Sequence, residues 1–185
     1  YKEFYIPISE NRKINAWSIS SDSRNKGTVV LYHGYMDEKS KMLPYAYDIL
    51  EMGYEVILID FEGSGKSSGN RTTIGHHEAE NVKTSVDYIK YVLHKQKIFL
   101  LGFSMGSVAI FKAQYDYTMP IDGIIAEASY GNMLETIEAR GKIAGLGNAS
   151  KISASAFLFW FGLINDLDAF SVNPEEYVKT ITIPT

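Results

Sequence analysis

Short apolar runs alternate with amphipathic stretches along most of the chain, and this alternation predicts its strands and helices. Two β-rich runs at 3–8 and 14–20 flank a polar stretch, which predicts an antiparallel hairpin. Continuous apolar runs predict strands buried on both faces, at 28–32, 55–60, 97–103 and 121–126. Apolar residues at helical spacing predict helices between them, at 42–52, 78–93 and 105–115. Such alternation predicts an α/β fold with a mainly parallel, doubly wound sheet.

The alternation stops after residue 130, which divides the chain into three parts. Residues 1–130 form the predicted core, 131–173 a small helical cap or lid, and 174–185 the return to the core, with a new strand beginning at Ile181. The cap contains an aromatic cluster that runs from Phe157 to Phe161. This cluster is open to three interpretations: ordinary packing of a cap helix, the wall of an apolar substrate pocket, or a lid that touches a membrane.

Composition and charge narrow the classes of protein that remain. The 185 residues carry a net charge of -4 and no basic run, so nucleic acid is not an expected partner. The chain has no cysteine, which excludes a disulfide framework and a thiolate metal site, and we expect no metal and no cofactor. The longest apolar stretch, 156–164, is too short for a membrane helix. Without a visible signal sequence the cytoplasm is favoured, but the chain opens on Tyr1, so an upstream leader stays an alternative.

One serine lies where a strand is expected to turn directly into a helix. The sequence from Gly102 to Gly106 reads G-F-S-M-G, with Ser104 at its centre. In a nucleophile elbow, this turn holds the serine in a strained conformation and needs small residues two positions before and after it. Its hydroxyl then lies at the carboxyl end of the sheet, where ligands bind in α/β folds. The pattern predicts that Ser104 is a catalytic nucleophile.

A second turn complements this serine. His33-Gly34-Tyr35 follows the predicted strand 28–32. In elbow enzymes one backbone N–H that stabilises the oxyanion comes from the residue after the nucleophile, here Met105, and another comes from such a turn. Tyr35 is the candidate for the second donor. We expect His33 and Gly34 to support the turn rather than to act as catalysts.

These motifs resemble the serine-hydrolase branch of the α/β-hydrolase superfamily, in particular its serine aminopeptidase-like and monoacylglycerol-lipase-like members. The resemblance rests on His33-Gly34-Tyr35, the loop Asp60 to Ser67, Thr73-Ile74-Gly75 with Glu78, and the elbow from Gly102 to Gly106. Glu62 departs from the family, whose loop usually carries arginine there. The resemblance implies hydrolysis of a small carboxylic ester through an acyl-enzyme on Ser104, with cleavage of a short peptide or amide as the alternative.

The catalytic base is missing from the sequence. A triad on this fold runs serine, then acid, then histidine, yet all four histidines precede Ser104. We therefore expect the C-terminal strands and helices of the fold to be absent, and the usual acid and histidine to lie beyond Thr185. Glu127, at the end of a predicted strand, is a less favoured alternative acid. Without a downstream acid and histidine, a non-catalytic binding module is the remaining interpretation. The oligomeric state is left open.

Overall fold

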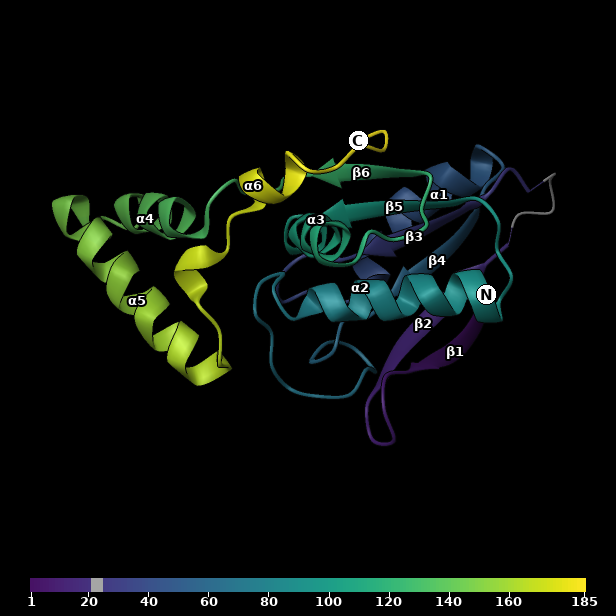
Figure 1. The fold of residues 1–185 in the computed structure, drawn as a ribbon, viewed down its shortest axis with the longest axis horizontal. Coiled ribbons are helices and arrows are strands. Elements are labelled where there is room, and N and C mark those ends of the chain that lie inside the picture. The colour runs from purple at the N-terminus through teal and green to yellow at the C-terminus, as the bar shows by residue number, and fades with distance from the viewer. Residues whose placement is uncertain (21–24) are drawn as a thin grey trace. The chain divides into compact units, whose positions relative to one another are not determined.

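The computed structural model describes residues 1–20 and 25–185, and a six-stranded mixed sheet is the centre of its first part. The sheet order is β1-β2-β4-β3-β5-β6 (Figure 1). Its strands are β1 (Lys2–Pro7), β2 (Lys13–Ile19), β3 (Thr28–Tyr32), β4 (Glu55–Ile59), β5 (Ile98–Phe103) and β6 (Gly123–Glu127). β1 and β2 form the expected antiparallel hairpin, and β2 joins β4 antiparallel. β3 to β6 are parallel, so their carboxyl ends meet at one edge of the sheet.

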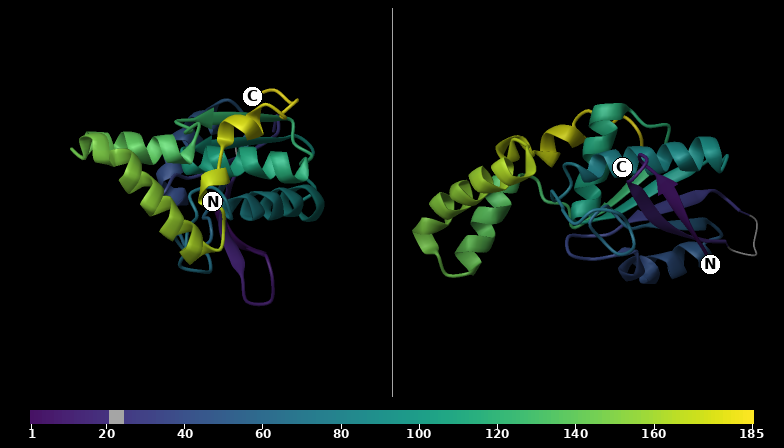
Figure 2. Two further views of the ribbon diagram at one scale, coloured as in Figure 1. Left: turned by 60° about the vertical axis from the view of Figure 1, so that its left-hand side comes forward. Right: turned by 90° about the horizontal axis from the view of Figure 1, so that it is seen from below.

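Helices cover both faces of this sheet (Figure 2). Helix α1 (Leu43–Glu51), preceded by the 3-10 turn η1 (Lys39–Met42), packs on one face, where Ala46 and Ile49 join the buried side chains of β3 and β4. Helices α2 (Glu78–Asp87) and α3 (Met105–Tyr117) lie side by side on the other face. The predicted helix 78–93 is present, but its last turn is the π-helix η2 (Tyr88–Val92).

Residues Tyr130–Thr180 form a second compact unit, whereas Ile181–Thr185 group with the first. The second unit contains α4 (Met133–Ile143), η3 (Gly147–Ala149), α5 (Ser150–Asn165), η4 (Ala169–Ser171) and α6 (Pro174–Val178). Asn132 caps α4, because its side chain accepts a hydrogen bond from the N–H of Glu135 at 3.1 Å. Helix α6 lies in this unit, although sequence analysis placed its residues in the return to the core.

The strand expected to begin at Ile181 is not formed. Residues 181–185 have no strand geometry, and they meet β6 through one backbone hydrogen bond, from the N–H of Ile124 to the carbonyl of Pro184 at 2.9 Å. Pro184 itself has no N–H, so that residue can accept a hydrogen bond from β6 but cannot donate one. Within the described residues, no helix is long and apolar enough to cross a membrane.

Candidate active site

Ser104 stands in a strained turn between β5 and α3. Its φ of 50° and ψ of -111° lie outside the regions that L-residues ordinarily occupy. The N–H of Ser104 donates to the carbonyl of Glu127 at 2.8 Å, which ties the turn to the end of β6. The serine is partly exposed, and Met105 follows it as the first residue of α3. As a first-turn residue, Met105 has an N–H without an acceptor inside the helix.

The two glycines of the motif are required by close backbone approaches. A Cβ on Gly102 would lie 2.5 Å from the nitrogen of Ser107, and one on Gly106 would lie 2.3 Å from the carbonyl oxygen of Tyr32. The hydroxyl of Ser107 donates to the carbonyl of Gly102 at 2.6 Å and closes the turn. Gly106 therefore brings the start of α3 directly against the end of β3, the strand that leads into the second turn.

His33 is fixed by hydrogen bonds through both of its ring nitrogens. Nδ1 lies 2.8 Å from the carbonyl of Gly34, and Nε2 accepts the N–H of Phe61 at 3.1 Å. Since Nε2 accepts, Nδ1 must carry the proton and donate it. The ring is fully buried, and burial lowers the pKa of His33. These bonds tie the turn to the loop that follows β4 and leave neither nitrogen for proton transfer.

The rest of this turn lies beside the elbow. A Cβ on Gly34 would lie 3.1 Å from the ring of Phe103, the residue that precedes Ser104. The N–H of Asp37 donates to the carbonyl of Gly34 at 3.3 Å, so the chain reverses there. Tyr35 is exposed within this reversal. The two turns that sequence analysis singled out thus stand together at the carboxyl edge of the sheet.

A buried ion pair between Lys39 and Asp60 holds the far end of the same loop. The side chain of Asp60 is fully buried and accepts from the N–H of Lys39 at 2.7 Å and from its Nζ at 2.5 Å. It also accepts the N–H of Lys66 at 3.0 Å. The sequence alone does not indicate this pair, because its residues are 21 positions apart and only tertiary structure brings them together.

Glu127 lies next to the elbow, but its carboxylate has another partner. Its backbone carbonyl accepts from Ser104 and, at 3.1 Å, from the hydroxyl of Ser107. Its carboxylate accepts a hydrogen bond from the hydroxyl of Tyr45, and desolvation together with this bond raises the pKa of the tyrosine. β5 pairs Phe103 with Glu127, so both side chains lie on the face that α1 covers. The carboxylate is thereby directed toward α1.

The other histidines lie elsewhere. His94 lines a surface hollow with Thr28 and Lys97, at the amino ends of β3 and β5 and hence at the edge opposite Ser104. His76 and His77 precede α2 in the loop after Thr73. Burial lowers the pKa of His76, with help from the positive charge of Lys112.

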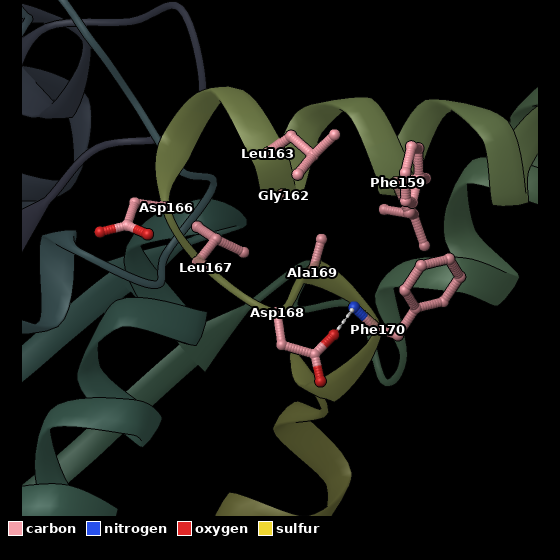
Figure 3. Close-up of a pocket in the computed structure, with 9 residues that line it drawn as sticks. Phe159, Gly162, Leu163, Asp166, Leu167, Asp168, Ala169 and Phe170 are labelled. Atoms are coloured by element: carbon pink, nitrogen blue, oxygen red, sulfur yellow. Dashed lines mark hydrogen bonds between the residues drawn. The ribbon is translucent and has the colours of Figure 1, made fainter.

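A groove of about 440 Å³ lies within the second unit, between α5 and the segment that follows it (Figure 3). Phe159 and Leu163 of α5 form one side, and residues 166–170 form the other. Asp168 uses one oxygen to accept the N–H of Phe170 at 3.0 Å, as the dashed line in Figure 3 marks. Trp160 does not line this groove and is 62% exposed.

Comparisons with known proteins agree with this architecture. The Pyrococcus furiosus esterase Pf2001 superimposes over 100% of this chain and 68% of its own, with a TM-score of 0.74 and 27% identity. In a second crystal form the identity is 30%, over 78% of this chain and 57% of that one, with a TM-score of 0.67. An α/β serine hydrolase homologue from Coxiella burnetii, at 23% identity and a TM-score of 0.57 over 68% of this chain and 61% of its own, shares the fold. The molecule therefore has the α/β-hydrolase fold.

A sequence comparison also shows the family to which this chain belongs. The sequence profile described as "Serine aminopeptidase, S33" matches residues 23–157, well over half of the chain. The chain belongs to this serine aminopeptidase-like family of α/β-hydrolases. The uncharacterized protein YqkD of Bacillus subtilis (strain 168) is 28% identical over 107 residues, which are 57% of this chain and 34% of that protein. The chain thus spans about a third of this curated relative and 57 to 68% of the solved esterase.

Proposed function

We propose that this protein is a serine hydrolase that cleaves a small carboxylic ester through an acyl-enzyme on Ser104. The observation that carries the proposal is the backbone of Ser104, held at positive φ between a strand and a helix by two glycines that no larger residue can replace. Such strain costs about 1–3 kcal/mol and persists where the surrounding structure enforces it, most often at functional sites. The similarity of the chain to the Pyrococcus furiosus esterase supports ester rather than other hydrolytic chemistry.

In the proposed reaction the hydroxyl oxygen of Ser104 attacks the ester carbonyl carbon. A general base takes the hydroxyl proton, and the carbonyl oxygen becomes an oxyanion. The N–H groups of Met105 and Tyr35 would donate to that oxyanion, because both belong to the turns that meet at this edge of the sheet. The C–O bond to the leaving group then breaks, the alcohol departs with the proton, and water hydrolyses the acyl-enzyme.

The proposal requires a histidine base, and this sequence has no histidine after Ser104; it also requires an acid. His33 is unsuitable because both of its nitrogens are hydrogen-bonded and its ring is buried. Glu127 remains an alternative acid, although Tyr45 already binds its carboxylate. We place the histidine, and in preference also the acid, in residues of the complete gene product that follow Thr185.

A fluorophosphonate probe applied to the complete gene product tests the nucleophile. We expect labelling at Ser104, and Ser104→Ala should abolish it together with hydrolysis of p-nitrophenyl acetate, since loss of a triad serine costs roughly 10⁶ in kcat. Ser153→Ala is the matched control, because its exposed hydroxyl donates to the carbonyl of Ala149 at the start of α5 and takes no part in the elbow. Residual activity of more than a few per cent in Ser104→Ala would refute the assignment.

A second candidate activity is cleavage of a short peptide or amide near its N-terminus. The name of the matching family, a serine aminopeptidase, favours it. Parallel assays with a p-nitrophenyl ester and an amino-acid p-nitroanilide separate the two: turnover of the anilide at a kcat/KM equal to or above that of the ester would establish the peptidase. If neither substrate reacts and Ser104 stays unlabelled, the non-catalytic binding module is the better description.

A further inference from the structure

A buried carboxylate that the proposed reaction does not use lies beside the elbow. Glu78, the first residue of α2, is only 4% exposed. No basic side chain within the described residues forms an ion pair with it at close range. An uncompensated buried carboxylate is costly, so the hydrogen bonds that replace its hydration must be good ones.

Those hydrogen bonds all come from the short loop 72–75. Oε1 accepts the hydroxyl of Thr72 at 2.7 Å and the N–H of Thr73 at 2.8 Å. Oε2 accepts the hydroxyl of Thr73 at 2.7 Å and the N–H of Gly75 at 2.9 Å. Both oxygens are therefore satisfied, and the position at the start of a helix adds favourable interaction with the helix dipole. One side chain thus fixes the conformation of four consecutive residues.

The loop that Glu78 fixes packs directly on the first turns of α3. The hydroxyl oxygen of Thr72 lies 3.3 Å from Sδ of Met105, the residue that follows the elbow serine. Gly75 has a φ of 106°, and a Cβ there would lie 2.6 Å from the side chain of Val108. The loop therefore supports α3 at two points, one turn apart, and the first point is the residue whose N–H we assign to the oxyanion.

We propose that Glu78 is a positioning residue of the active site, which acts through loop 72–75 and Met105. The inference rests on the proposed function, because it gives Glu78 a part in stabilising the oxyanion. Its carboxylate holds Thr72 against Met105, and this contact keeps the first N–H of α3 directed at the reacting carbonyl. Oxyanion donors act only in a narrow range of distance and direction, so a small displacement of Met105 lowers the rate of acylation more than it weakens substrate binding.

The variant Glu78→Gln tests the positioning role of Glu78, because glutamine has nearly the same shape as glutamate. The amide nitrogen cannot accept, so two of the four hydrogen bonds are lost, whichever oxygen it replaces. We expect kcat for p-nitrophenyl acetate to fall about tenfold to a hundredfold, while KM stays within about twofold. This decrease in kcat is smaller than or similar to the one that follows removal of a whole oxyanion donor. Glu80→Gln is the matched control on the same helix, because Glu80 is exposed and, among the residues that the structure describes, its ion pair is with Arg12. It should retain wild-type kcat and KM.

Thr72→Val provides a second variant should Glu78→Gln fold poorly. It removes the hydroxyl that joins Glu78 to Met105 and keeps the branched shape, so kcat should again fall with KM little changed. Thr72→Ser restores the hydroxyl and should recover most of the rate. In the double variant the effects should be clearly less than additive, because both changes break the same connection. Fully additive losses, or an increase in KM with unchanged kcat, would overturn the inference.

One measurement separates this inference from the proposed function. The NMR signals of the Met105 amide and methyl group report its position without any turnover. Glu78→Gln should shift both signals, whereas Glu80→Gln should shift neither. Shifted signals in a protein whose Ser104 resists the fluorophosphonate would uphold the coupling to Met105 and reject the catalytic role of the site. Unmoved signals in a protein that is labelled would reject the positioning role and leave the proposed function standing.

Discussion

Ser104 occupies a backbone conformation that few residues tolerate, and its neighbours explain why it stays there. The turn is closed by the Ser107 hydroxyl on the carbonyl of Gly102, and anchored to β6 by the N–H of Ser104 itself. Gly106 allows α3 to begin against the carbonyl of Tyr32. The strain is thus imposed by hydrogen bonds and close packing on three sides, and each of these can be tested by a single substitution.

Gly106→Ala should be far more destabilising than an ordinary glycine substitution. Its Cβ would lie 2.3 Å from a backbone carbonyl that is part of β3 and cannot move aside. We expect a loss of about 3 kcal/mol or more in the free energy of unfolding. Gly145→Ala is the control: φ there is 89°, but nothing lies within 4 Å, so only the conformational cost of about 1–2 kcal/mol applies. Equal losses in urea unfolding would mean that α3 does not begin against β3 as described.

His33 should make stability depend on pH. Burial lowers its pKa in the folded state, although Asp60, Asp37 and Glu78 oppose the shift. Well above pH 6.5 the ring is neutral in both states. As the pH falls below about 6.5 the unfolded state binds a proton that the folded state does not, so stability decreases until the folded pKa is reached. The slope should not exceed about 1.4 kcal/mol per pH unit for this group.

His33→Asn is the variant that checks this. It should be less stable than the wild type at about pH 7.5, because the acceptor for the N–H of Phe61 is lost or misplaced. Its melting temperature should nevertheless decrease less between about pH 7.5 and about pH 5.5. His76, whose pKa burial also lowers, contributes a slope of its own, so His76→Asn is measured alongside. A wild-type slope that survives in His33→Asn and disappears in His76→Asn would assign the pH dependence to His76 instead.

Helix α5 lies in the segment that the sequence indicates as a helical cap, and its buried face differs from its aromatic cluster. The sequence indicated a helix with an aromatic cluster, and the rings of Phe157 and Phe161 do stack, with centroids 5.6 Å apart. The buried stripe, however, is made of Ser150, Ala154, Leu158 and Gly162, which recur every four residues. Small residues let α5 approach its neighbours closely, as Gly162 shows: a Cβ there would lie 2.6 Å from the carbonyl of Leu167. The apolar character of a helix alone does not indicate which of its faces packs closely against neighbouring segments.

Leu158 and Trp160 should therefore respond differently to truncation. Leu158 is fully buried, and Leu158→Ala should cost about 2–5 kcal/mol. Trp160 is 62% exposed, so Trp160→Ala should leave the melting temperature close to that of the wild type. We propose that this unit acts as a cap that sets acyl-chain preference, and Trp160→Ala should then change the ratio of kcat/KM between p-nitrophenyl butyrate and p-nitrophenyl octanoate. An unchanged ratio with normal stability would remove Trp160 from substrate selection.

At the scale of the whole molecule, the sequence predicted the strands and helices better than the long-range contacts between residues. Each strand from Thr28 to Glu127 and each helix between them carries a local apolar pattern, and each is present within a few residues of its predicted range. The elbow was predictable for the same reason, since strand, turn and helix are contiguous. The hydrogen bond between His33 and Phe61 joins residues 28 positions apart. The ion pair between Lys39 and Asp60 joins residues 21 positions apart. No pattern within one sequence indicates such pairs, because they depend on β3 and β4 lying side by side.

The catalytic base that Ser104 needs has to come from the complete gene product. No histidine follows Ser104, and the match to the solved esterase covers 68% of that chain, so about a third of it has no counterpart here. If Ser104 is the nucleophile, the complete gene product must bring a histidine within about 2.6–3.2 Å of its hydroxyl, with a carboxylate on the other ring nitrogen.

Two features of the structure indicate where in the sequence the histidine and the acid should lie. The segment 181–185 already lies along the exposed edge of β6, through the bond between Ile124 and Pro184. A parallel strand that continued along this edge would end beside Ser104, as the carboxyl ends of β3, β5 and β6 do. Because a strand has about five or six residues, we expect an aspartate roughly 10–15 residues beyond Thr185 and a histidine after one further helix and strand.

This prediction is tested by sequencing the gene beyond the codon for Thr185 and by substituting the histidine and aspartate found there. Replacement of the histidine by alanine should reduce ester hydrolysis as strongly as Ser104→Ala, and the two changes together should cost little more than either alone, because the residues act as one unit. If the aspartate makes no difference while Glu127→Gln abolishes turnover, the acid is Glu127, and its bond to Tyr45 must be released in the active form. A reading frame that ends at Thr185, without a second chain to supply the histidine, would leave the binding module as the function of this fold.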